Sequence, residues 1–178
     1  MSGSDFYDMD RLEQIAVNLF YGWGHNFYRL ENQLRADDLL VRSHVGAQLA
    51  SARSSVETAL SDYRRTFLPP PTREQPLPDP AAVARARTLE ELSAGIGQLE
   101  GAIRALPVPE NDRMTQRYRE EAETLLHLRE CDTRLVGQAE TLRQLLARDH
   151  QWILENAAVI REGLQLMRRT LEARQALL

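Results

Sequence analysis

The chain of 178 residues contains no lysine, so all 22 of its basic residues are arginines. It also has 26 acidic residues, and the resulting net charge of −4 argues against a general polyanion-binding protein, which usually has a basic excess. Two interpretations of the missing lysine are open. One is a GC-rich genome; the other is selection against lysine modification, or for the forked contacts that arginine makes with carboxylates and phosphates.

Cysteine and long apolar runs are also scarce. Cys131 is the only cysteine, which excludes an intrachain disulfide and favours a reducing compartment. Residues 1–10 lack the basic and apolar regions of a signal peptide, and no run reaches the roughly 18 apolar residues of a membrane-spanning helix. We therefore expect a cytoplasmic protein without a membrane partner.

Proline is concentrated in one segment, because six of the eight prolines lie between residues 68 and 80. This density excludes helix and central strand, and it predicts an extended, polyproline-like connector that is long enough to cross one end of a helical bundle. Asp79 and Pro80 then provide a helix start, with the aspartate as the cap and the proline in the first turn.

The rest of the chain shows helical periodicity. Apolar residues recur at gaps of three and four, which places an apolar stripe along one side of a helix, and residues 111–178 keep this pattern without a single proline. The segment 36–38 offers a cap or a corner between the first two helices. Asp149 and Asn156 interrupt the last stripe, either by fixing the register inside a packed seam or by breaking the helix near Asp149 and His150.

These patterns predict an all-α protein with one helical domain over residues 1–178. We expect an elongated bundle of four to five long, roughly antiparallel helices with coiled-coil-like seams and a proline-rich crossover. The expected helices cover about residues 6–35, 37–67, 80–106, 111–148 and 150–178, and the proline-rich linker covers residues 68–80.

Aromatic residues are few, and seven of the 11 lie at or before Tyr28. The first expected helix is apolar on more than one side, which is typical of a helix that is buried between several partners or keeps one side for another protein. The side that we assign to the intramolecular core contains Leu12, Leu19, Trp23 and Leu30. The candidate partner-binding residues are Phe20, Tyr21, Trp23, Phe27 and Tyr28, so that Trp23 belongs to both sets. Their alternative role is the core of the bundle, whereas tryptophan and tyrosine in a partner surface would anchor an interface.

One group of residues has the chemistry of a metal site. Glu120, Glu123, His127 and Cys131 recur at helical gaps of three and four, and carboxylate, imidazole and thiolate are all metal ligands. Helical di-iron proteins, however, repeat a Glu-x-x-His element on paired helices, whereas this chain has one Glu-x-x-x-His. We interpret the group as a charged helix face with a packed cysteine, and we expect no metal and no cofactor.

Arg143 and His150 are separated by six residues, which is similar to the Arg-x4-6-His element of HEPN-type ribonucleases. That resemblance implies an all-helical, often dimeric ribonuclease. With 22 arginines and four histidines, chance gives about 1.5 such pairs, and the chain has one. We therefore assign no family from it.

Clustered arginines suggest a further alternative, an accessory nucleic-acid-binding subunit whose arginines contact phosphates. The clusters are Arg64–Arg65, Arg168–Arg169 and the group Arg113, Arg117 and Arg119. Acidic residues dilute the last group, so we interpret these arginines as solvated helix faces with pairing between residues four apart.

The sequence has no nucleophile elbow, catalytic triad signature or phosphate-binding loop followed by a lysine. It favours a non-catalytic helical adaptor or scaffold subunit that acts through helix–helix protein contacts and oligomerisation, with a protein partner, a second copy of the chain, or both. The alternatives are a small helical enzyme or metal protein, either HEPN-like or with a Glu/His/Cys site, and the accessory nucleic-acid-binding subunit.

Overall fold

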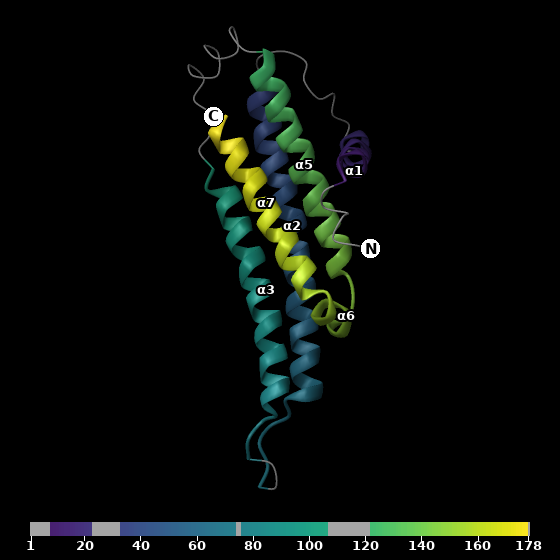
Figure 1. The fold of residues 1–178 in the computed structure, drawn as a ribbon, viewed down its shortest axis with the longest axis vertical. Coiled ribbons are helices and arrows are strands. Elements are labelled where there is room, and N and C mark those ends of the chain that lie inside the picture. The colour runs from purple at the N-terminus through teal and green to yellow at the C-terminus, as the bar shows by residue number, and fades with distance from the viewer. Residues whose placement is uncertain (1–7, 23–32, 74–75, 107–121, 178) are drawn as a thin grey trace.

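The structure is a computed structural model that describes residues 8–22, 33–73, 76–106 and 122–177. Within these ranges the chain forms helices and no strand, which confirms the all-α prediction (Figure 1). The described helices are α1 (Met9–Gly22), α2 (Gln33–Phe67), α3 (Pro80–Arg104), α5 (Ala122–Leu146), α6 (His150–Glu155) and α7 (Ala157–Ala176). Not one of these six is both long and apolar enough to traverse a bilayer.

Two long helices set the long axis of the molecule. α2 has 35 residues and is therefore about 52 Å long at 1.5 Å per residue. α3 lies beside it and runs back along it (Figure 1). The apolar stripe of α2 is buried at Val45, Leu49, Ala52, Val56, Leu60 and Tyr63. The stripe of α3 is buried at Leu89, Leu92, Ile96, Leu99 and Ile103, so the three-four spacing of both helices becomes one shared core.

The proline-rich connector is a hairpin loop rather than the expected crossover, because it joins two neighbouring helices at the same end of the molecule (Figure 1). The predicted start of α3 is confirmed. The Asp79 carboxylate accepts hydrogen bonds from the backbone N–H groups of Ala81 at 3.1 Å and Ala82 at 3.2 Å, and Pro80 occupies the first turn. This cap starts α3 beside the end of α2, so the connector joins adjacent helix ends and does not cross the bundle.

The boundary expected at residues 36–38 is wrong, because α2 already begins at Gln33 and continues through both aspartates. An aspartate inside a helix costs at most about 0.7 kcal/mol relative to alanine. Two aspartates therefore do not end α2, because burial of the apolar residues that follow them outweighs this cost. α1 ends at Gly22, and residues 23–32 lie outside the described residues.

The C-terminal stripe is divided at both of its polar residues. Asp149 caps α6 by accepting a hydrogen bond from the Trp152 backbone N–H at 2.9 Å, so the break near His150 is real. A second break follows at Asn156, whose side-chain Nδ2 donates to the Trp152 carbonyl at 2.9 Å. The single helix expected over residues 150–178 is therefore wrong, because an asparagine that bonds its own backbone competes with helix continuation.

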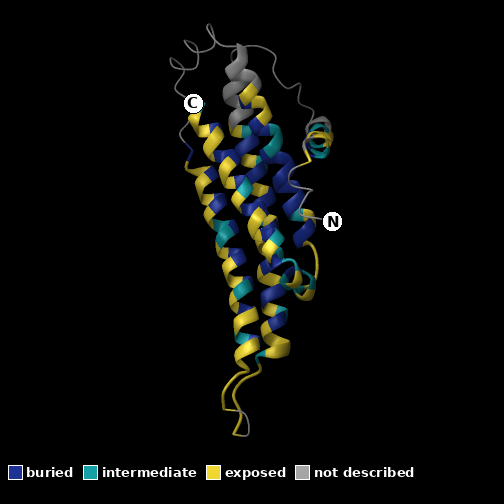
Figure 2. Ribbon diagram, viewed as in Figure 1, coloured by how far each residue is buried: buried dark blue, intermediate teal, exposed yellow. Residues whose placement is uncertain are grey.

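α5 is the most enclosed of the described helices, with α1, α2 and α7 packed against it. Figure 2 shows it largely in the colour of buried residues. α1 crosses α5 steeply, since Figure 1 views α1 nearly along its axis while the long helices run up the page. At the crossing Leu12 is 1% exposed and rests on Gly137, where a Cβ would lie only 2.7 Å from the Leu12 carbonyl oxygen. Glycine at position 137 is thus a requirement of close helix approach.

Gly137→Ala should destabilise the protein by about 1–3 kcal/mol, because the added methyl meets the backbone of Leu12 and α1 must shift. Gly46→Ala is the matched control in α2, where a Cβ would have no atom within 4 Å. That substitution should stabilise the protein by about 0.5–1 kcal/mol through helix propensity alone. Denaturant unfolding followed by circular dichroism measures both, and equal stabilisation by the two alanines would contradict the contact.

Candidate functional site

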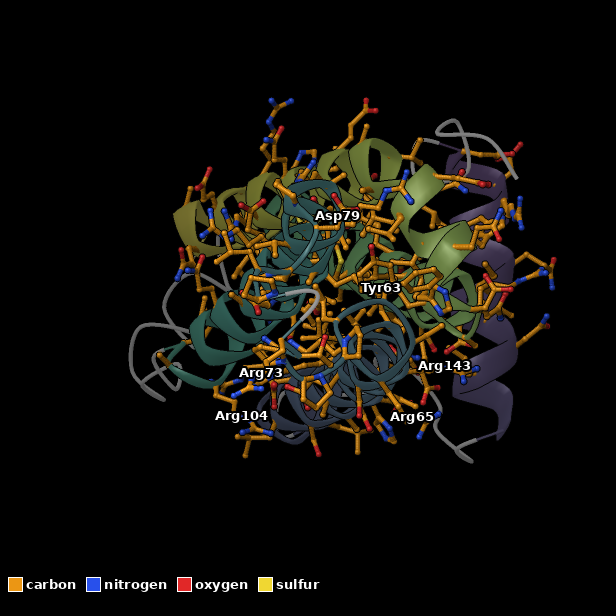
Figure 3. All side chains as sticks on the ribbon, turned by 90° about the horizontal axis from the view of Figure 1, so that it is seen from below. Tyr63, Arg65, Arg73, Asp79, Arg104 and Arg143 are labelled. Carbon is orange, nitrogen blue, oxygen red and sulfur yellow. The ribbon has the colours of Figure 1, made fainter. Side chains whose placement is uncertain are left out.

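An aromatic cluster lies where the end of α2 meets α6. Tyr63 and Phe67 are one turn apart on α2, and their ring centroids are 4.8 Å apart. The His150 ring meets both edge-on, with centroid distances of 5.5 Å to Tyr63 and 5.7 Å to Phe67. Tyr63 is 2% exposed and Phe67 is 46% exposed, so the cluster leads from the core to the surface. In Figure 3, which looks along the molecule from below, Tyr63 lies inside the ring of helices.

Local contacts in the turn before α6 hold His150 in this position. The Asp149 cap fixes the start of α6, and His150 is the first residue of that helix. The Arg148 guanidinium carbon lies 5.9 Å from the centroid of the Trp152 ring, within the range of a cation–π contact. The break in the C-terminal stripe therefore turns a histidine toward the aromatic end of α2.

Two pockets share His150. The larger has a volume of about 550 Å³ and lies between α2, α3 and α6. Its lining consists of Tyr63, Phe67, Arg85, Thr88, His150, Gln151, Leu154 and Glu155. The smaller has a volume of about 300 Å³ and is bounded by hydroxyl-bearing residues of α2 and by the turn at residues 146–149. The larger volume lies in the range of about 300–1,000 Å³ that is typical of small-ligand sites.

A buried polar network connects α5 to α2 around Glu140, which is 6% exposed. The Arg143 guanidinium donates to both carboxylate oxygens, at 2.7 Å and 2.6 Å. Gln144 donates at 2.9 Å, and Gln48 donates from α2 at 3.2 Å. The hydrogen bonds from Arg143, followed by those from the two glutamines, hold the pKa of Glu140 below its ordinary value of 4.5, although burial opposes them. The same pairing raises the pKa of Arg143.

A second buried charge pair connects α5 to α7. Arg174 Nε donates to Asp132 Oδ1 at 2.6 Å, and the two side chains are 1% and 5% exposed. Cys131 is buried beside this pair. Burial, and then the neighbouring Asp132 carboxylate, raises the pKa of the Cys131 thiol above 9.0. The thiol therefore stays protonated at neutral pH and packs as a small apolar group.

Of the four candidate metal ligands, the structure describes only the side chains of His127 and Cys131, and it places them in different surroundings. The His127 side chain is 62% exposed, with its Nδ1 3.7 Å from a Glu130 carboxylate oxygen, whereas Cys131 is buried. Glu120 and the side chain of Glu123 lie outside the described residues. Over the part of the chain that is described, no group of three such side chains could hold a metal ion.

The candidate ribonuclease pair is separated by a helix boundary. Arg143 lies on α5 and is held by Glu140, while His150 begins α6 and packs against aromatic rings. The break between residues 147 and 149 removes the single helix on which the spacing would place both side chains on related turns.

The structure does not test the candidate partner-binding residues. Trp23, Phe27 and Tyr28 lie outside the described residues, as do the side chains of Phe20 and Tyr21.

Among the clustered arginines, Arg64 pairs with Glu90 and Arg65 pairs with Asp62. The group Arg113, Arg117 and Arg119 is not described.

Helical periodicity predicted a helix over residues 37–67, which includes Tyr63 and Phe67, but it did not indicate that these rings meet His150. The available signal was the Asp149 cap immediately before a histidine, which predicts where a helix starts but not what it faces.

No protein-family model matches the chain, and no curated protein or solved structure matches it significantly.

Asp132→Asn should destabilise the protein by about 3–5 kcal/mol, because it removes the carboxylate charge that pairs with the buried Arg174 guanidinium at 2.6 Å. The double replacement Asp132→Leu with Arg174→Met should cost less than either single change. Glu90→Gln, which breaks the exposed pair with Arg64, is the control and should cost no more than about 1 kcal/mol. Urea unfolding measures each of these variants, and a single change at the buried pair as mild as the control would show that the pair is not required.

The Glu140 network should make the free energy of unfolding depend on pH in the acidic range. Because the folded protein lowers the pKa of Glu140 from 4.5, its contribution to stability is present above about pH 4.5 and is lost as the pH falls through the lower, folded value. Glu140→Gln should flatten this part of the pH profile relative to the wild type. Thermal melts between about pH 2 and 7 test the difference, and parallel profiles for the two proteins would refute it.

Proposed function

We propose that the protein is a non-catalytic helical adaptor or scaffold subunit that acts through helix–helix contacts with a protein partner, a second copy, or both. In this proposal the long helices form a roughly antiparallel bundle with coiled-coil-like seams. The observation that carries it is the docking of α1. Leu12 and Ala16 are buried against α5, and the sequence then continues directly into the aromatic segment at residues 20–28. A helix that is fastened across a bundle is a rigid base for an interaction surface.

The aromatic segment supplies the proposed anchors. Phe20, Tyr21, Trp23, Phe27 and Tyr28 are of the residue types that fill pockets at the centre of protein interfaces. The Leu12 side of α1 already has its intramolecular partner, which favours a second use for the aromatic residues that follow.

The charged groups of the described residues also support a structural role. Three titratable groups with shifted pKa values are engaged inside the bundle, Cys131 by packing and Glu140 and Arg143 by their ion pair. Surface arginines pair with carboxylates along and between helices, as in Arg53 with Glu57 and Arg161 with Glu91. Arginines engaged in this way favour a soluble helical surface over phosphate contacts.

Changing Tyr21 and Tyr28 together to alanine should weaken assembly while leaving the melting temperature nearly unchanged, because both belong to the proposed partner surface. Trp23→Ala, on the side assigned to the core, should destabilise the fold by about 3–5 kcal/mol. Sedimentation velocity and thermal melts on the same samples separate the two effects, with Glu13→Gln as an exposed control on α1. If the tyrosine pair unfolds the protein as badly as the tryptophan change, the segment is core and the proposed surface is lost.

The wild-type protein should be an elongated dimer or part of a larger complex in solution. Light scattering combined with small-angle X-ray scattering measures its mass and radius of gyration. A compact monomer with a radius of gyration of about 16 Å, as expected for a globular chain of this length, would argue against the oligomerising role.

A further inference from the structure

The larger pocket beside His150 has one apolar wall. Tyr63 and Phe67 supply two rings from α2, and His150 presents a third ring edge-on to both. Leu154 of α6 adds an aliphatic side chain to the lining. Aromatic rings pack favourably in offset or edge-to-face geometry, so this wall suits a ligand that contains an aromatic ring.

The pocket also contains two opposite charges that do not pair with each other. Arg85 comes from α3 and Glu155 from α6, and no ion pair joins them although both line the same space. Among the described residues, Arg85 makes no hydrogen bond or ion pair, whereas Glu155 accepts one hydrogen bond at 3.0 Å from Gln151. Other arginines near this end do pair between helices, as Arg64 does with Glu90.

We propose that this pocket binds a small aromatic zwitterion, of the chemical class of the free aromatic amino acids. The ligand ring lies against the wall of Tyr63, Phe67 and His150. Its carboxylate binds the Arg85 guanidinium, whose fork of N–H donors matches a carboxylate, and its ammonium binds the free oxygen of Glu155. The inference goes beyond the adaptor role and does not depend on it.

The two charges select this ligand over simpler ones. An aromatic acid without an ammonium would bring its charge near Glu155, and an aromatic amine without a carboxylate would bring its charge near Arg85. Either mismatch costs affinity, because the ligand charge is repelled by the like charge of the pocket and the other pocket charge gains no partner from the ligand. Thr88 donates its hydroxyl hydrogen to the Ala84 carbonyl at 3.2 Å, so its oxygen remains an acceptor for the ammonium.

Calorimetric titration of the full chain tests the ligand class. L-phenylalanine, L-tyrosine and L-tryptophan are compared with 3-phenylpropionate, which lacks the ammonium, and phenethylamine, which lacks the carboxylate. At least one amino acid should bind about tenfold or more tightly than both analogues, from the value of a charge-assisted hydrogen bond. Failure of all three amino acids to bind at millimolar concentration would overturn the proposal, as would equal binding of either analogue.

Two variants and a control locate the site. Arg85→Gln and Glu155→Gln should each weaken binding of the amino acid about tenfold or more, and Arg85→Gln should bind phenethylamine as well as it binds the amino acid. Arg87→Gln lies on the same helix outside the pocket lining and should leave affinity unchanged. Thermal melts confirm that each variant is folded. Unchanged affinity in both pocket variants, or an equal loss with Arg87→Gln, would show that any binding occurs elsewhere.

Discussion

The burial of α5 is the constraint on which the rest of the structure depends. Other helices pack against it along most of its described length, yet its sequence contains Asp132, Gln138, Glu140 and Thr141, all of them buried. A buried charge without a partner costs several kcal/mol, so α5 can be enclosed only where its neighbours supply the matching groups. Arg174 does so from α7, and Gln48 does so from α2, together with the local Arg143.

These polar contacts act on geometry more than on total stability. Apolar stripes of leucine and isoleucine tolerate sliding by a turn, because one aliphatic side chain replaces another at similar cost. A carboxylate that must meet a guanidinium does not tolerate this slide. We infer that the Asp132–Arg174 pair and the Glu140 network fix α7 and α2 in one register against α5, in the manner of a single polar residue in a coiled-coil seam.

The sequence predicted the helices where three-four spacing is long and the ends carry strong signals. The stripe of α2 and the start of α3 at Asp79 belong to this class. It left two roles open at Asp149, one of them the observed break, and it missed the break at Asn156, because a polar residue in an apolar stripe has the same local signature whether it fixes register or ends a helix. The contacts beyond the stripe decide between these roles, and the sequence does not show them.

The candidate pocket was harder to foresee for the same reason. His150 is more than eighty residues from Tyr63, and no local pattern indicates that they meet. Gly137 is a second residue whose role the sequence does not reveal. A glycine in a helix is usually a cost, and only the Leu12 backbone above it explains why a side chain would not fit. Partner binding stays a prediction, because Trp23, Phe27, Tyr28 and the side chains of Phe20 and Tyr21 lie outside the described structure.

The docking of α1 also divides the folding free energy of the molecule into unequal parts. The extensive contacts of α1 are with α5, whereas α2, α3, α5 and α7 share a core with one another. Lifting α1 away would remove Ala16 from that core but leave α2, α3, α5 and α7 packed on one another, so we expect α1 to open at a lower free energy than global unfolding. In that open state the apolar surface around Gly137 is accessible while the protein remains folded. The contact between α1 and α5 would then break and re-form without unfolding of the other helices.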